Sequence, residues 1–281
     1  MVFLAALLIW GLKFGIDFTG GSLLEVKFSG LRPTVDQVET NLAPLKLNSL
    51  IVQPVGAADM MLKFQDTTEA THQAVLTNLN ALAKATDNNA IEELRYESVG
   101  PSIGAELKAK SLWAVFFALI AMLSYITYVF RKVSLPVASW KYGLSAIIAM
   151  FHDTIITMGV FAVLGHFYGV EVNTPFVAAL LTVLGYSVHD TIVVFDRIRE
   201  NLPKSDLDFT GTVNMSLNQT LVRSLNTSLT VLLVLLAIII YGGASIRTFA
   251  LALAIGIFIG TYSSIFVASP LLVIWEKLGK K

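Results

Sequence analysis

The sequence predicts a polytopic α-helical membrane protein with six transmembrane helices and one small α+β domain between the first helix and the second. Of the 281 residues, 55% are hydrophobic and 14% are charged, whereas soluble domains carry about 25% charged residues. Six apolar segments recur along the chain, and most of them reach the length that a transmembrane helix needs. The polar residues 17–104 interrupt them with both strand-like and helix-like periodicity.

The first apolar segment, residues 1–16, is short and contains Lys13. Crossing a bilayer takes about 20 apolar residues. A signal peptide would have a basic region before the apolar stretch and a small-residue cleavage pattern after it, and this segment has neither. We therefore expect a first transmembrane helix whose cytoplasmic end is very short or missing.

Residues 17–104 are expected to form the α+β domain. Alternating apolar residues predict strands, and apolar residues at helical spacing predict helices. In chain order the sequence predicts a strand over 22–28, a helix over 34–45, strands over 49–53 and 60–64 around a turn at 54–56, a helix over 67–84 and a strand over 91–98. This βαββαβ order is that of a ferredoxin-like domain.

Residues 105–281 are expected to form a domain of five transmembrane helices. The apolar runs cover residues 111–130, 142–165, 175–195, 224–241 and 248–275, and each is long enough to cross a bilayer. The connector 196–223 contains apolar residues at helical spacing, namely Phe209, Val213, Leu217 and Leu221. We expect it to lie along the cytoplasmic membrane surface as an amphipathic segment.

Basic residues predict the orientation of the helices. Those beside the apolar runs fall in the loop 131–141, in the connector and in the tail: Arg131, Lys132, Lys141, Arg197, Arg199, Lys204, Arg223, Lys277, Lys280 and Lys281. The short loops on the opposite side, 166–174 and 242–247, contain only Arg247. By the positive-inside rule, both termini are cytoplasmic and residues 17–104 are extracytoplasmic.

Asp190 is the most informative polar residue in the apolar runs. An acid within a transmembrane helix costs about 2.5–3.5 kcal/mol on insertion scales, so its presence suggests a functional site. Ser187 lies three residues earlier and shares its helix face. The next run carries a polar stripe at spacing i, i+3, i+4 and i+7, formed by Arg223, Asn226, Thr227 and Thr230.

Two neighbouring antiparallel helices could bring Asp190 close to this stripe. An arginine stabilises a charged carboxylate, so a rearrangement of the pair would change the proton affinity of the acid. Structural roles explain the stripe as well as a proton relay does. Arg223 is suited to anchoring a helix end at the membrane surface, and Asn226, Thr227 and Thr230 to hydrogen bonds between helices.

His152 and Asp153 form a second polar group in the run 142–165. They are either a further part of a proton relay or a buried structural pair. With Ser187 and Thr230, they form a secondary set of candidate relay residues.

Several function classes are excluded or disfavoured by composition. Without cysteine, the chain has no disulfide, no thiolate metal site and no cysteine nucleophile. The four histidines lack metal-ligand spacing, and no Walker A motif is present. The formal net charge of zero argues against a nucleic-acid partner. We expect no cofactor, no metal and no enzymatic activity.

Residues 100–104, GPSIG, match the G-x-S-x-G pattern of hydrolases. A nucleophile there would need a hydrolase sheet and a later histidine and acid on the same side of the membrane. After Ser102, the only outward histidine is His166 in a nine-residue loop. We therefore expect a turn that leads from the last strand into the second transmembrane helix.

Several segments resemble one family of membrane proteins. Residues 15–21, GIDFTGG, resemble the G-I-D-F-x-G-G motif of the SecD/SecF protein-export membrane proteins. Four further segments resemble the SecF members in particular: residues 99–104, 185–201, 223–228 and 256–265. The resemblance follows nearly the whole chain in order.

The resemblance implies a function and partners. SecF proteins pair with a SecD-type subunit in a proton-driven machine of the resistance-nodulation-division superfamily, in the bacterial cytoplasmic (inner) membrane. They associate with the SecYEG channel and use the proton motive force to drive late movement and release of exported preproteins. The family's acid on the fourth transmembrane helix matches Asp190, its arginine on the fifth matches Arg223, and Thr227 lies one turn further on.

Two alternative functions remain open at this point. A proton-driven small-molecule exporter of the same superfamily would use similar proton chemistry, but would need a larger outward domain with a ligand cavity. A passive scaffold of the translocon would keep Asp190 and Arg223 only as a structural pair.

Overall fold

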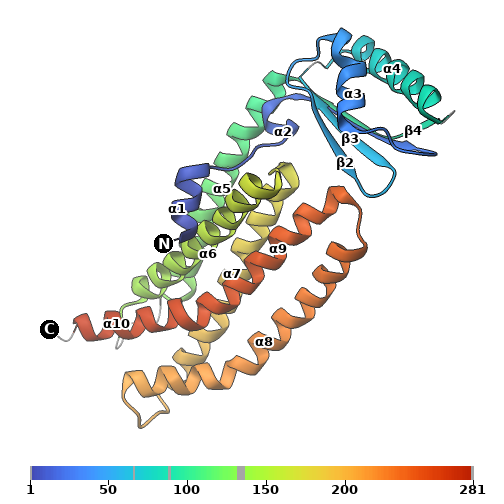
Figure 1. Ribbon diagram of the computed structural model, residues 1–281. Coiled ribbons are helices and arrows are strands. Elements are labelled where there is room, and N and C mark those ends of the chain that lie inside the picture. Colours follow the sequence, from blue (N-terminus) through green and yellow to red (C-terminus); the bar gives the residue numbers. More distant parts are fainter. Residues whose placement is uncertain (1, 66, 88–89, 132–136, 280–281) are drawn as a thin grey trace. The chain divides into compact units, whose positions relative to one another are not determined.

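The computed structural model describes residues 2–65, 67–87, 90–131 and 137–279. They form two compact units (Figure 1). The α+β unit comprises Phe14–Lys110, and the helical unit combines Met1–Lys13 with Ser111–Lys281. Lys132, Lys280 and Lys281, which contribute to the predicted orientation, lie outside the described residues.

The α+β unit contains the six elements that the sequence predicts, in the same order. After the short helix α2 (Ile16–Thr19) follow β1 (Gly21–Phe28), α3 (Val35–Leu42), β2 (Ile51–Val55), β3 (Asp59–Phe64), α4 (Glu69–Asp87) and β4 (Ile91–Val99). The sheet has the strand order β2-β3-β1-β4. All three strand pairs are antiparallel, and a register shift between Glu25 and Val26 interrupts the β1–β4 pair.

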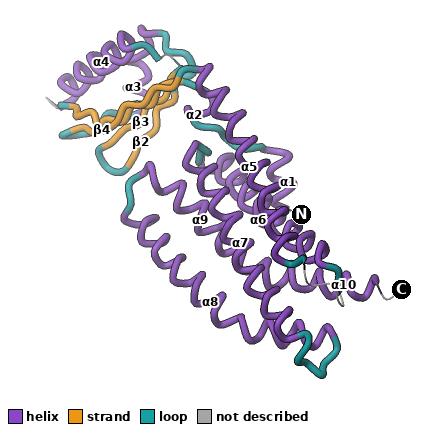
Figure 2. Tube along the Cα trace, turned by 180° about the vertical axis from the view of Figure 1, so that it is seen from behind, coloured by secondary structure: helices purple, strands orange, loops and turns teal. Residues whose placement is uncertain are grey.

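The core of the α+β unit lies between the sheet and the two longer helices. Leu24, Val26 and Phe28 of β1 point into this core and are buried, whereas Lys27 between the last two is exposed. Figures 1 and 2 show α3 and α4 on the same face of the sheet. Their contributions to the buried cluster are Val38, Leu42, Val75, Leu79 and Ala83.

Local sequence signals explain where α3 and β2 begin and end. Thr34 caps α3 with a capping box, in which the Gln37 amide donates to Thr34 Oγ1 at 3.3 Å and the Thr34 amide donates to Gln37 Oε1 at 2.8 Å. The turn predicted at 54–56 begins two residues later, at Gly56 (φ +55°). Pro54 instead belongs to β2, where it is tolerated because β2 is an edge strand.

The helical unit contains five helices that are long and apolar enough to cross a bilayer, counted over the described residues. They are α5 (Pro101–Val129), α6 (Ser139–Tyr168), α7 (Thr174–Asn201), α8 (Phe209–Tyr241) and a last segment over Ile246–Leu278. The last segment consists of α9 (Ala244–Ser263), the π-helical turn η2 (Ser264–Ala268) and α10 (Ser269–Gly279). The N-terminal helix α1 (Val2–Trp10) has nine residues.

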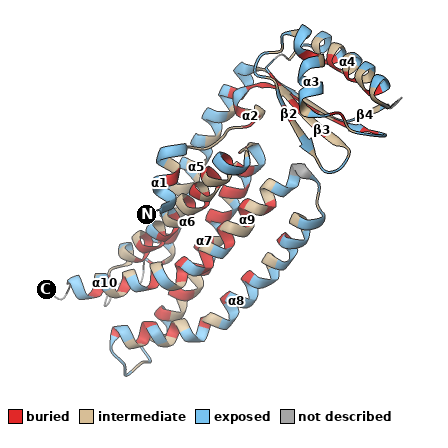
Figure 3. Cartoon of the chain, viewed as in Figure 1, coloured by how far each residue is buried: buried red, intermediate tan, exposed pale blue. Residues whose placement is uncertain are grey.

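Burial differs strongly between these helices (Figure 3). About half of the most apolar window of α7 and of the last segment is buried, against 17% in α8 and 6% in α5. The exposed residues of α5 and α8 are largely apolar, including Trp113, Phe117 and Leu229. Such faces suit a lipid environment or another apolar helix rather than water.

The connector 196–223 is not a separate element. Its first residues complete α7, and residues 209–223 form the beginning of α8, so that only 202–208 link the two helices. Asp208 caps α8 by accepting the Gly211 amide at 2.8 Å. Asn201 Nδ2 donates to Ser216 Oγ at 2.8 Å, which ties the end of α7 to α8.

The G-x-S-x-G segment forms the predicted turn. β4 ends at Val99 and α5 begins at Pro101, with Ser102 exposed in its first turn. A Cβ on Gly104 would lie 3.1 Å from the Phe18 carbonyl oxygen, so this glycine allows the chain after α1 to pass close to α5. The arrangement explains the glycine without a nucleophile.

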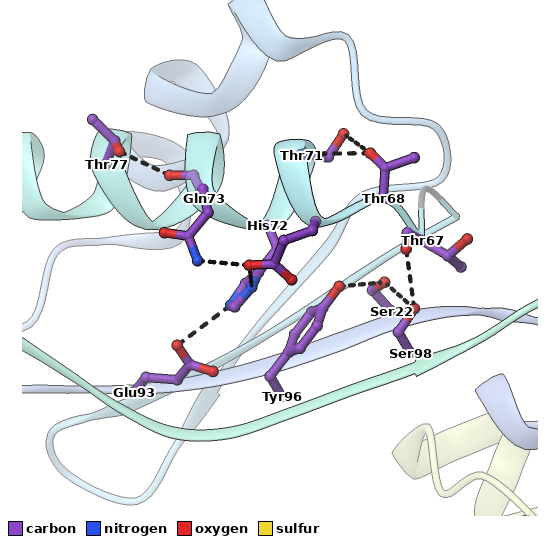
Figure 4. A network of polar contacts seen from close by, with 11 residues as sticks. Ser22, Thr67, Thr68, Thr71, His72, Gln73, Thr77, Glu93, Tyr96 and Ser98 are labelled. Atoms are coloured by element: carbon purple, nitrogen blue, oxygen red, sulfur yellow. Dashed lines mark hydrogen bonds and ion pairs between the residues drawn. The ribbon is translucent and has the colours of Figure 1, made fainter.

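A buried histidine links α4 to β4 (Figure 4). The His72 ring stacks on Tyr96 with ring centroids 3.7 Å apart. Its Nδ1 lies 3.2 Å from Glu69 Oε1, and its Nε2 lies 3.3 Å from Glu93 Oε2. A hydrogen bond from Gln73, together with His72, lowers the pKa of Glu69 below its ordinary range.

Leu24→Ala should destabilise the α+β unit by about 2–5 kcal/mol, because it leaves a cavity between β1 and the helices. Amide hydrogen exchange in β1 and β3 of the full chain should accelerate accordingly. Leu94→Ala is the matched control, since Leu94 is 45% exposed on β4. Equal exchange in the two variants would contradict the core described above.

Acidification should loosen the first turn of α4. A pKa lowered by folding means that the carboxylate of Glu69 stabilises the unit above the ordinary Glu pKa of about 4.3, and that this contribution disappears as pH falls through the lowered value. The amides of α4 should then lose protection in wild type at low pH, beyond the intrinsic effect of pH on exchange. Glu69→Gln should abolish this acid-dependent step, whereas Glu39→Gln on α3 should keep it.

Candidate functional site

Asp190 lies in the middle of α7 and is 8% exposed. Its carboxylate accepts two hydroxyl hydrogen bonds from two other segments. Ser224 Oγ of α8 donates to Oδ1 at 2.5 Å, and Ser264 Oγ of η2 donates to Oδ2 at 2.6 Å. Hydrogen bonds to a carboxylate are short and strong, especially away from water. Asp190 therefore ties α7, α8 and the last segment together.

Asp153 of α6 is fully buried and has a similar environment. Ser187 Oγ of α7 donates to its Oδ2 at 2.6 Å, and Ser263 Oγ of α9 donates to the same oxygen at 2.7 Å. His152 Nδ1 lies 3.0 Å from Oδ1. Ser187, which the sequence places on the face of Asp190, thus binds the other acid.

The π-helical turn η2 lies where the last segment meets both acids. Ser263 and Ser264 are consecutive, yet one donates to Asp153 and the other to Asp190. A π turn disturbs the α-helical hydrogen bonds, and such turns occur frequently at functional sites. Here Ser269 Oγ donates to the Ser264 carbonyl at 2.9 Å, which satisfies a backbone acceptor inside the turn.

A second group of hydroxyls lies close to Asp190. Tyr186, one turn earlier on α7, shares a hydrogen bond of 2.9 Å with Ser228 of α8. Ser228 in turn lies 2.5 Å from Thr261 Oγ1 of α9. The helices around Asp190 are thus joined by hydrogen bonds of hydroxyl groups.

Glycines let α9 approach α7 closely enough for these contacts. A Cβ on Gly256 would overlap the Val183 side chain, and a Cβ on Gly260 would lie 3.2 Å from Ser187 Cβ. The two glycines are four residues apart and share one face of α9. Small residues at this spacing allow membrane helices to pack at short distance.

The predicted stripe of α8 lies on a different face from the residue that binds Asp190. Arg223, Asn226, Thr227 and Thr230 are all exposed. Thr227 Oγ1 donates to the Arg223 carbonyl, and Thr230 Oγ1 to the Asn226 carbonyl. In this conformation the structure therefore does not bring the stripe to Asp190.

The buried face of α8 carries a second polar stripe, which sequence reasoning missed. Its members recur every four residues: Ser216, Thr220, Ser224 and Ser228. The strict spacing is visible in the sequence, but small hydroxyls are common at helix contacts and carry no charge.

Arg223 lines a polar groove between α7 and α8. The groove has a volume of about 500 Å³ and is lined by Ile192, Val193, Asp196, Arg197, Glu200, Gln219, Thr220 and Arg223. Thr220 belongs to the buried stripe, so the groove lies beside the helix face that carries Ser224. Within the described part of the chain, no group of three or more histidine or acidic residues could hold a metal ion. The buried polar groups around Asp153 and Asp190 are hydroxyls.

The family comparison covers most of the chain. Residues 78–278 match the model of the protein export membrane protein SecD/SecF, C-terminal region. Residues 6–30 match the SecD/SecF GG motif. This chain belongs to the SecD/SecF family.

Individual SecD/SecF relatives are similar over nearly their whole length. "Protein translocase subunit SecF" of Thermobaculum terrenum is 46% identical over 279 residues, covering 96% of this chain and 86% of that protein. The protein of the same name from Anaerolinea thermophila is 41% identical, covering 97% and 87%. The crystal structure of SecDF, a translocon-associated membrane protein from Thermus thermophilus, matches with a TM-score of 0.81 and 34% identity. This match covers 98% of our chain and 36% of that longer chain.

The structure gives a physical reason for the GG motif of the SecD/SecF family in this chain. Gly20 and Gly21 have φ angles of +75° and +123°, which residues with a side chain rarely adopt. A Cβ on Gly20 would lie 2.7 Å from Pro101 Cα, and a Cβ on Gly21 would lie 2.8 Å from the Phe64 carbonyl oxygen. The motif starts β1 beneath the first turn of α5.

Gly256→Ala should destabilise the helical unit by about 1–3 kcal/mol, because the added methyl group has no space against Val183. The thermal stability of the purified chain should fall. Gly185→Ala is the matched control, since a Cβ there meets only Met122 Cε, at 3.9 Å. In an open helical position, Gly→Ala stabilises by roughly 0.5–1 kcal/mol. Two variants with the same stability would contradict the close α7–α9 packing.

Proposed function

We propose that the chain acts as a SecF subunit that uses the proton motive force, together with a SecD-type subunit, to drive late movement and release of exported polypeptides through the SecYEG channel. The observation that carries the proposal is Asp190: a buried acid within a transmembrane helix, bonded only to hydroxyls through the contacts described, in a protein of an export family. Relatives named protein translocase subunits support it.

The proposed arrangement has six transmembrane helices, with α1 as the first. The helices lie in the bacterial inner membrane, surrounded by lipid. Both termini are cytoplasmic, and residues 17–104 form an extracytoplasmic domain. The strand order β2-β3-β1-β4, with antiparallel pairs and both helices on one face, supports a ferredoxin-like fold for that domain. The basic residues of the connector support the orientation.

The proposed relay uses Asp190 as the residue that takes up and releases the proton. A carboxylate only accepts hydrogen bonds, whereas a carboxylic acid also donates one. When Asp190 gains a proton, the oxygen that carries it becomes a donor and a weaker acceptor, so the contact of that oxygen with Ser224 or Ser264 weakens or reverses its direction. Because these contacts join α7 to α8 and to η2, protonation changes how the helices pack.

Arg223, Asn226 and Thr227 enter the relay through a rotation of α8. Adjacent helical residues point about 100° apart, so a turn of α8 by one residue position would replace Ser224 with Arg223 beside Asp190. An arginine there favours the charged carboxylate. Asp153, His152, Ser187 and Thr230 are proposed as the secondary set, with Ser187 now placed on Asp153. The exposed face of α8 is proposed to meet the SecD-type subunit.

Asp190→Asn should abolish the stimulation of export by a proton gradient, because the amide keeps the shape of the side chain but does not titrate. The measurement is export into vesicles that contain the chain, its partner subunit and the channel, with and without a gradient. Asp206→Asn, in the exposed link between α7 and α8, is the control and should keep the stimulation. Full stimulation in an assembled Asp190→Asn complex would favour the passive scaffold instead.

A further inference from the structure

His72 lies between two carboxylates that belong to two different elements of the α+β unit (Figure 4). The residue is buried, with 6% of its surface exposed. Its Nδ1 lies 3.2 Å from Glu69 Oε1 on α4, and its Nε2 lies 3.3 Å from Glu93 Oε2 on β4. Nε2 is itself buried and, among the described residues, has no hydrogen bond of good geometry. Each ring nitrogen therefore faces a carboxylate oxygen, and Nε2 depends on Glu93 for its polar contact.

The number of protons on the ring decides whether both contacts are favourable. A neutral imidazole has one N–H group and one nitrogen with a lone pair, so in either tautomer a lone pair faces a carboxylate oxygen. The imidazolium has an N–H group on both nitrogens. Tyr96 favours the same charged form, because its ring is stacked on His72 with centroids 3.7 Å apart, and the face of an aromatic ring attracts a cation. These three contacts oppose the effect of burial, which by itself favours the neutral ring.

The other charged groups on neighbouring elements are exposed or make other contacts. Arg95 and Glu97 of β4 pair with each other, 2.5 Å apart. Further exposed charges are Glu92 of β4, Asp36 and Glu39 of α3, and Lys46 beyond α3. The charges in contact with the ring, over the described residues, are therefore those of Glu69 and Glu93.

The contact with Glu93 lies beside an irregularity of β4. This strand is at the edge of the sheet, and its register with β1 shifts between Glu25 and Val26, which leaves Leu94 of β4 without a counterpart. Such a bulge interrupts the ladder of hydrogen bonds and bends the strand. Beyond it, Ile91–Glu93 continue the pairing with β1 up to the end of the strand. The contact with His72 thus attaches this short strand end to α4 as well.

We propose that His72 is a proton-binding site that locks the strand end Ile91–Glu93 to α4. With the additional proton, the ring binds Glu69 and Glu93 at once. Without it, the Nδ1–H group keeps its hydrogen bond to Glu69, which lies one turn earlier on the same helix, and Nε2 presents a lone pair to Glu93. The side chain of Glu93 is 34% exposed, so it turns to solvent, and the strand end loses its attachment to α4.

The lock therefore closes at low pH and opens as the pH rises. It is separate from Asp190 and involves none of the residues of the helical unit. In the proposed orientation the α+β unit faces the side from which protons enter, so the lock is closed when that side is acidic. Only this last step, the sense of the response in the cell, rests on the proposed function.

Nitrogen NMR of the full chain in lipid nanodiscs, labelled at histidine alone, tests the proton site directly. The chain has four histidines, so the signals of His72 are identified by their absence in His72→Gln. Between about pH 8 and pH 5, where histidine side chains change charge, the wild-type ring should change from one protonated nitrogen to two. In Glu93→Gln the ring should bind its proton about threefold to tenfold more weakly, because one of the two carboxylates is lost. Glu92→Gln is the matched control, since Glu92 is the exposed neighbour on the other face of β4, and it should leave proton binding unchanged.

Amide hydrogen exchange tests the lock. Relative to the intrinsic exchange rates, the amides of Ile91–Glu93 in wild type should be better protected at about pH 5 than at about pH 8. Glu93→Gln and His72→Gln should lose this difference, and Glu92→Gln should keep it. The range lies above the ordinary Glu pKa of about 4.3, so the acid-dependent loosening of α4 at Glu69 does not interfere.

Two results would overturn the proposal: His72 signals that do not change across this pH range, or a pH dependence of exchange at Ile91–Glu93 that is the same in wild type and Glu93→Gln. If His72→Gln does not fold, the signals that move in Glu93→Gln but not in Glu92→Gln identify His72, and these two variants decide the outcome. Neither measurement uses a gradient or an exported polypeptide. A failure here is therefore separate from a failure of the export experiment.

Discussion

The helical unit is organised by the need to give hydrogen-bond donors to two carboxylates inside apolar helices. A carboxylate away from water must be paired or hydrogen-bonded. The donors here are serines on the facing helices, two for each acid. A serine reaches only a short distance, so the helices must approach closely. Gly256 and Gly260 of α9 make this possible, and in this way the two acids account for the small residues around them.

The π turn begins where the last segment contacts the two acids. Consecutive residues of an α-helix point about 100° apart, and Ser263 and Ser264 must reach acids on two different helices, α6 and α7. The wider turn begins at Ser264 and leaves backbone groups without their usual partners. Ser269 supplies one of the replacement hydrogen bonds. The last segment thus contacts both acids where its backbone departs from the regular α-helix.

Much of the fold could be predicted from the sequence, and the site only in part. Alternation along β1 and the apolar runs predict the α+β order and the long helices, because burial imposes a period on the sequence. Asp190 and Asp153 are identifiable because acids are rare in such helices. The hydrogen-bond partners of the acids are not identifiable from the sequence, because α8 carries two polar stripes. Arg223 marks one by its charge, whereas Ser224 belongs to an uncharged one that hydropathy does not distinguish from apolar surroundings. Which stripe faces inward depends on tertiary packing.

The sequence predicts the connector as a separate segment because the end of α7 and the start of α8 both lie outside the apolar runs. In the structure these residues continue the two helices.

The two stripes of α8 also bear on how easily this helix could rotate against α7 and the last segment. Rotation of a helix costs the apolar contacts that it loses, roughly in proportion to the buried area. About half of the apolar window of α7 and of the last segment is buried, but only 17% of that of α8 (Figure 3). The contacts that hold α8 to Asp190 and to Thr261 are hydrogen bonds of Ser224 and Ser228. Protonation of Asp190 weakens the first of them. The helix that carries Arg223 thus has little buried apolar surface to lose, and one of the bonds that hold it to α7 ends on the carboxylate of Asp190.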